Sequence, residues 1–144
     1  MVDVPAQSLI PDDYLPDVHT RLVMYKRIAS ARDESELRDL QVEMIDRFGL
    51  LPEQCKSLFK ITELKLKARP IGIRKIVVGG DVGTITFTEK PDIDPMKIIL
   101  LIQNRPKRFK LDGNEKLKFF WKMENKDDRL RVLEDVLDIL ADEV

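Results

Sequence analysis

The chain has 144 residues, of which 43% are hydrophobic, enough for one domain with a real core. Its 25 basic and 26 acidic residues leave a formal net charge of −1, so no overall charge favours nucleic acid or an acidic membrane. A single cysteine excludes an intramolecular disulfide and a thiolate metal cage. No apolar run reaches membrane-spanning length and Met1–Ser8 does not resemble a signal peptide, so a reducing, cytoplasmic location without membrane contact is expected.

The first half of the sequence predicts one strand and three helices. Ser8–Ile10 is a short apolar run between two prolines, which is typical of an edge strand. Asp17 can cap a first helix. A third helix follows Pro52 and is expected to end before Pro70, because a proline disfavours helical backbone in the residue that precedes it. The apolar residues of the first helix recur at helical spacing, at Val18, Leu22, Tyr25 and Ile28.

The second helix has the clearest boundaries. Asp33 with Glu36 three residues later resembles a capping box with aspartate as the cap, and Gly49 suits the left-handed position after a helix end. The predicted apolar face consists of Leu37, Leu40, Met44 and Phe48. Four carboxylates fall within an arc of about 80° beside that face, at Glu36, Asp39, Glu43 and Asp46. Such an acidic stripe either faces water or meets a basic partner.

Two β-hairpins are predicted in the second half. The segment 71–78 is rich in β-branched residues, and 84–88 alternates threonine with apolar residues. The glycine-rich segment 79–83 between them is expected to be the turn. A second hairpin joins 109–111 to 117–121 around an Asp-Gly pair.

Two further helices complete the predicted fold. Asp94 and Pro95 open a fourth helix that ends before Pro106, and a final helix starts near Asp127. The order is strand, three helices, hairpin, helix, hairpin, helix, which predicts an α+β fold with helices packed on a small mixed sheet. Since no linker or repeat interrupts residues 1–144, we expect a single domain.

Catalysis receives little support from the sequence. A G-x-x-x-x-G-K-[ST] phosphate loop is absent, and the glycine-rich segment 79–83 does not precede a helix. His19 is a lone histidine, more often a surface imidazole than a general base. Cys55 could have a lowered pKa near a helix start, but a structural thiol is the commoner outcome. We therefore predict a domain that is not an enzyme and has no catalytic residue, cofactor or metal.

Basic residues gather near the second hairpin. Aromatic residues are interleaved with them, and basic and aromatic side chains together can hold single-stranded nucleic acid. The other interpretation is a strand with core aromatics on one side and lysines on the other. Nucleic-acid binding is the alternative function, with the basic residues Arg105, Lys107, Arg108 and Lys110 as its candidates.

Two segments at a fixed distance, IPDDYLPDVHTRLVMYKRIASA from Ile10 and VEMIDRFGLLP up to Pro52, resemble the C-terminal (TRCF) domain of bacterial transcription-repair coupling factors (Mfd). The resemblance continues through GIRKI at Gly72–Ile76 and FKLDG at Phe109–Gly113. It implies a regulatory domain excised from a larger ATP-dependent DNA translocase, whose motor motifs this sequence lacks.

The resemblance also implies a partner. In that family the domain packs on the UvrB-like N-terminal module of the same chain and competes with UvrA for it. It also helps restrain the translocase, while other parts of the protein bind RNA polymerase and DNA. Glu43 and Asp46 match the acidic positions that face basic residues of that module. Glu36 and Asp39 lie in a variable run, so only the acidic stripe makes them candidates.

Overall fold

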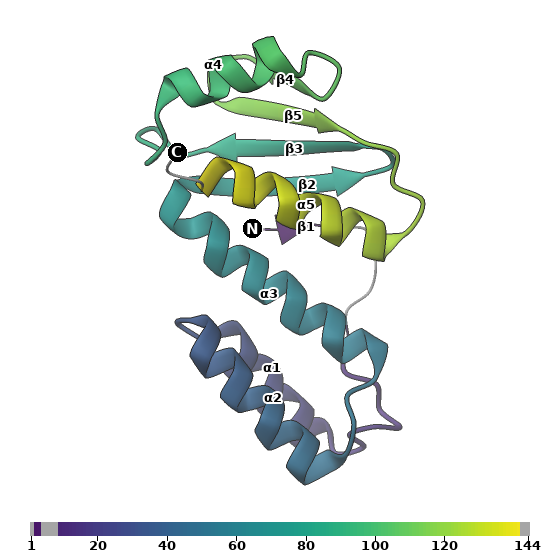
Figure 1. Ribbon diagram of the computed structural model, residues 1–144. Coiled ribbons are helices and arrows are strands. Elements are labelled where there is room, and N and C mark those ends of the chain that lie inside the picture. Colours follow the sequence, from purple (N-terminus) through teal and green to yellow (C-terminus); the bar gives the residue numbers. More distant parts are fainter. Residues whose placement is uncertain (1, 4–8, 142–144) are drawn as a thin grey trace. The chain divides into compact units, whose positions relative to one another are not determined.

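A computed structural model describes residues 2–3 and 9–141 of the chain (Figure 1). The described residues form five helices and five strands, which confirms the predicted α+β class. None of these helices is long and apolar enough to cross a membrane. In chain order the elements are β1 (Val2–Asp3), α1 (Val18–Ala29), α2 (Glu34–Phe48), α3 (Glu53–Ile71), β2 (Ile73–Gly79), β3 (Val82–Phe87), α4 (Pro95–Asn104), β4 (Phe109–Asp112), β5 (Lys116–Phe120) and α5 (Lys126–Ala141).

The described chain divides into two compact units. The helical unit comprises residues 9–66, and the sheet unit comprises β1 together with residues 67–141. Helix α3 contributes residues to both, since the division falls between Leu66 and Lys67. A single-domain organisation over residues 1–144 therefore stays a prediction.

The helical unit has the caps that the sequence predicts. The Asp17 carboxylate accepts the N–H of Thr20 at 3.0 Å, and the Asp33 carboxylate accepts that of Glu36 at 2.8 Å. Gly49 follows α2 with a φ of +98°, a conformation that glycine adopts without steric cost. The core of the unit includes Leu15, Met24, Ile28, Leu37, Leu40, Met44, Cys55 and Phe59.

The predicted edge strand Ser8–Ile10 is wrong for the residues that are described. Leu9 and Ile10 lie outside any strand, and Ser8 lies outside the described residues. Ile10 is buried and donates its N–H to the hydroxyl of Tyr25, so its backbone is satisfied by a helix side chain and not by a sheet. The strand at this edge of the sheet is β1, which precedes the predicted strand in the sequence.

Two helix predictions also need correction. On α1, Val18 and Leu22 are exposed, and the buried residues are Met24 and Ile28, because the packed stripe lies further round the helix than the sequence pattern indicates. Helix α3 does not end before Pro70 but includes it in its last turn. At that position the missing N–H removes only one helical hydrogen bond.

The sheet unit contains a five-stranded mixed sheet in the order β1-β2-β3-β5-β4. Strand β1 runs parallel to β2, and the other neighbours are antiparallel. Both predicted hairpins are present. The first turns at Gly80-Asp81, whereas Asp112 pairs with Lys116 at the end of β4, so the second turn is the segment 113–115.

The sheet and α5 form the core of the sheet unit. Figure 1 shows α5 lying along β2 and α4 beside β4. Four leucines of α5 are buried, as are the inward residues of the strands. The buried set includes Ile76, Ile85, Phe109, Leu117, Phe119, Leu130, Leu133, Leu137 and Leu140.

Candidate protein-interaction site

The acidic stripe of α2 lies beside the buried face of the helix. Leu37, Leu40 and Met44 point into the core, which leaves the neighbouring carboxylates at the surface of the helical unit. The structure therefore places the four predicted residues on one accessible side of a well-capped helix, at Glu36, Asp39, Glu43 and Asp46.

Glu43 is held by two arginines. Arg27 of α1 contacts both of its oxygens, with Nη1–Oε2 at 2.5 Å and Nη2–Oε1 at 2.8 Å, and Arg47 adds a contact of 3.0 Å to Oε2. Hydrogen bonds from Arg27, then from Arg47, lower the pKa of the Glu43 carboxyl to about 2. Glu43 is thus a fixed anion that helps to join α1 to α2.

The Glu36 carboxylate is also held by an arginine, Arg32. One carboxylate oxygen accepts the backbone N–H of Arg32 at 2.7 Å, and the other lies 3.0 Å from the Arg32 guanidinium. The carboxylate reaches back beyond Asp33 to the residue before the cap, so the predicted capping box is present in a shifted form.

Asp39 and Asp46 are exposed, and no side-chain hydrogen bond or ion pair links them to another part of the chain that the structure describes. Two exposed apolar side chains lie beside Asp46, at one border of the acidic stripe. Val42 is 67% exposed and Ile45 is 40% exposed. The surface of α2 therefore combines two unpaired carboxylates, two arginine-held carboxylates and an exposed apolar pair at their border. A partner with basic and apolar side chains would match it.

The sequence prediction did not include Arg27 and Arg47. Arg47 stands four residues after Glu43, a spacing at which opposite charges on a helix meet, so its role could have been predicted. Arg27 belongs to another helix, and its contact with Glu43 depends on how α1 packs against α2.

The basic cluster near the second hairpin is surrounded by engaged aromatic residues. The Arg108 guanidinium lies 4.7 Å from the centre of the Trp121 ring and donates to the Phe120 carbonyl at 3.1 Å. Phe109 and Phe119 are buried, so they are not available to stack on bases. Arg105, Lys107 and Lys110 are exposed, and the first two line a surface pocket together with Arg108 and Trp121.

The candidate base is His19 and the candidate nucleophile is Cys55. His19 is exposed on α1. Cys55 is fully buried, and burial raises the pKa of its thiol to about 11, which makes the reactive thiolate less accessible. The described residues contain no group of three or more histidine, cysteine, aspartate or glutamate side chains that could hold a metal ion.

Comparison with known proteins identifies the family of this chain. The TRCF domain family matches the chain over residues 4–98, which is well over half of its length. The chain belongs to the TRCF domain family. This confirms the resemblance drawn from the IPDDYLP and VEMIDRFGLLP segments, and it places the acidic stripe of α2 inside the matched part of the TRCF domain.

Longer relatives contain the same domain. The transcription-repair-coupling factor of Escherichia coli is 44% identical over 129 residues, which are 90% of this TRCF chain and 11% of the relative. That of Haemophilus influenzae is 43% identical over 140 residues, which are 97% of this chain and 12% of the relative. The chain thus spans about a tenth of the length of these relatives.

A solved structure shares the fold. The crystal structure of the C-terminal domain of a transcription-repair coupling factor superposes with a TM-score of 0.80 at 20% identity. The match covers 100% of this TRCF chain and 95% of the crystallised one. The α+β arrangement described above is therefore that of the TRCF domain.

Proposed function

We propose that this TRCF domain is a non-catalytic regulatory domain of a bacterial transcription-repair coupling factor acting in nucleotide excision repair. In this proposal it covers the UvrA-binding face of the UvrB-like module of the same protein and helps to restrain the translocase. Displacement of the domain, when the motor engages RNA polymerase and DNA, would open that face to UvrA.

The observation that carries the proposal is the exposed, unpaired Asp46 beside the apolar pair Val42 and Ile45 on α2. Unpaired carboxylates beside a small apolar pair suit a basic partner surface, with charge supplying specificity and the apolar pair supplying affinity. Glu43 contributes a carboxylate that Arg27 and Arg47 hold in place.

A weak contact is sufficient for a domain that covers the UvrA-binding face of its partner module. A tethered domain meets its partner at an effective concentration of order mM, so an interface of modest affinity stays closed in the intact chain. Exposed ion pairs contribute roughly 0–1 kcal/mol each, and the same modest affinity lets the contact open when the motor rearranges.

Titration calorimetry of this chain against the UvrB-like N-terminal module of the same parent tests the proposal. We expect binding that weakens as salt rises and that Asp46→Lys reduces strongly. Asp135→Lys is the matched control, because Asp135 is also an exposed helical aspartate but lies on α5 of the sheet unit. Equal binding by wild type and Asp46→Lys would contradict this function, as would no binding near mM concentration.

A further inference from the structure

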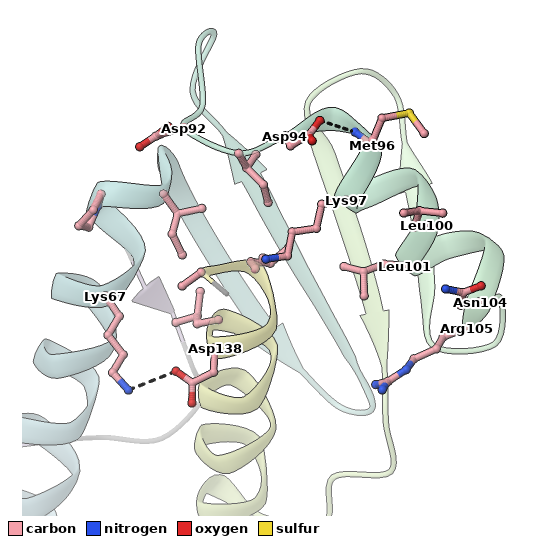
Figure 2. Close-up of a pocket in the computed structure, with 16 residues that line it drawn as sticks. Lys67, Asp92, Asp94, Met96, Lys97, Leu100, Leu101, Asn104, Arg105 and Asp138 are labelled. Atoms are coloured by element: carbon pink, nitrogen blue, oxygen red, sulfur yellow. Dashed lines mark hydrogen bonds and ion pairs between the residues drawn. The ribbon is translucent and has the colours of Figure 1, made fainter. Parts of the chain in front are cut away.

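A second candidate surface lies in the sheet unit. A groove of about 1110 Å³ lies between α4, the last turn of α3 and the C-terminal end of α5 (Figure 2). Its walls are part polar and part apolar, and the apolar part includes Ile71, Ile93, Met96, Leu100, Leu101 and Leu137.

Helix α4 forms one wall and is poorly covered. Six of its ten residues, in the sequence PMKIILLIQN, are isoleucine, leucine or methionine, yet none of its residues is buried. Met96, Ile99 and Leu100 are all exposed. A helix of this composition normally lies in a core, so its exposed apolar side chains mark an interaction surface.

Lys97 gives this groove a charge. Its ammonium nitrogen is shielded from solvent and has no hydrogen-bond acceptor among residues 2–3 and 9–141. Figure 2 shows the side chain reaching from α4 across the groove toward the end of α5. An ammonium group taken out of water is costly unless an anion compensates it, and residues 2–3 and 9–141 place no anion at this point.

The acidic residues in the groove wall do not supply that charge. Asp94 caps α4 by accepting the N–H of Met96 at 3.0 Å. Asp138 accepts a hydrogen bond from Lys67 at 3.4 Å. Asp92 lies on the far rim and points away from Lys97 (Figure 2).

We propose that this groove binds an amphipathic helix of a partner protein, with its apolar side chains against Met96 and Leu100 and a carboxylate on Lys97. A groove bordered by helices takes the apolar stripe of a third helix, which is a recurring mode of peptide recognition. The carboxylate fixes the register of the bound helix, because Lys97 places its shielded cation at one position along the groove.

The test uses the whole chain and two synthetic peptides. Both are acetylated, amidated amphipathic helices of about four turns with a leucine stripe. One carries glutamate beside the stripe, and the other carries glutamine at the same positions. Fluorescence anisotropy is expected to give saturable binding of the glutamate peptide, weakened about tenfold or more by Lys97→Met or by the change to glutamine. Binding that ignores both changes, or no binding at 1 mM peptide, would overturn the proposal.

Matched variants locate the site. Leu100→Ser and Leu111→Ser remove equally exposed leucines, at 48% and 47%, but only Leu100 lines the groove. The first is expected to weaken peptide binding and the second to leave it unchanged. Lys110→Met, on β4 outside the groove, is the control for Lys97→Met. Loss of binding in either control would overturn the assignment of the site.

Two further measurements complete the test. Lys97→Met is expected to unfold at the wild-type temperature or above it, because it removes a shielded charge without a described partner. A clear decrease in unfolding temperature would show that the chain itself satisfies Lys97 and would overturn the proposal.

Sedimentation must show a monomer. Dimerisation that is abolished by Lys97→Met would assign the groove to a second copy of the chain instead.

Discussion

Arg27 of α1 and Glu43 of α2 form a two-point ion pair, with distances of 2.5 and 2.8 Å between their nitrogen and oxygen atoms. The pair joins two helices of the helical unit at the edge of the proposed partner surface. Glu43 therefore has a structural contact as well as a proposed role in binding, whereas Asp46, one helical turn later, is free for a partner.

Acid should weaken the contribution of this ion pair to stability. The pKa of Glu43 is lowered from 4.5 to about 2 in the folded chain, so the carboxylate stabilises the fold fully above about pH 4.5. That contribution is lost as the pH falls toward about 2. Urea unfolding of wild type and Glu43→Gln should differ most near neutral pH, and the difference should shrink on acidification. A difference independent of pH would contradict this assignment.

Reversing the charge of Glu43 should affect folding, and neutralising Asp46 should not. Glu43→Lys places a third cation beside Arg27 and Arg47, so its urea midpoint is expected to fall. Asp46→Asn changes an exposed residue without a described partner, and stability should stay within about 0.5 kcal/mol of wild type. The exchange Arg27→Glu with Glu43→Arg should recover most of the stability lost in Glu43→Lys. No recovery would mean that the ion pair does not join the helices in solution.

The Cys55 thiol should be protected in the native chain. It is fully buried and its pKa is raised to about 11, so the thiolate is scarce and shielded near neutral pH. A thiol-reactive chromophore should label it slowly in buffer and rapidly in denaturing urea. Labelling of the native chain as fast as that of the unfolded chain would show that the core of the helical unit opens readily.

Gly83 should not tolerate a side chain. It stands opposite Phe119 across the β3–β5 pair, and a β-carbon at Gly83 would lie 1.9 Å from the Phe119 ring. Gly83→Ala forces that ring out of the core and should cost about 1–3 kcal/mol in urea unfolding. Gly79→Ala is the matched control, since Gly79 also lies in a strand but has open space around it. A similar loss in both variants would mean that strand propensity, and not the ring contact, is responsible.

Local chemistry made most of the elements predictable. Asp17, Asp33 and Asp94 cap helices through contacts within three residues, and Gly49 ends α2 through its own backbone conformation. Both hairpins follow from strand patterns with a glycine between them. Such features involve neighbours along the chain, so the sequence pattern alone contains the information.

Features that depend on distant residues were missed. The Ser8–Ile10 segment has the composition of an edge strand, but Ile10 finds its hydrogen-bond partner on Tyr25. The Glu43–Arg47 contact is local and could have been predicted, whereas Arg27 reaches Glu43 only through helix packing. The same reason applies to Lys97, whose shielded position depends on where α4 lies in the sheet unit.

The parallel pairing of β1 with β2 sets an order of events during synthesis. Val2 stands opposite Ile76, so the ribosome makes all of residues 9–66 before the partner of the first strand exists. The helical unit has its own core and mostly local contacts, which form quickly. It can therefore fold on the emerging chain before β2 is made, and β1 pairs only after β2 has emerged.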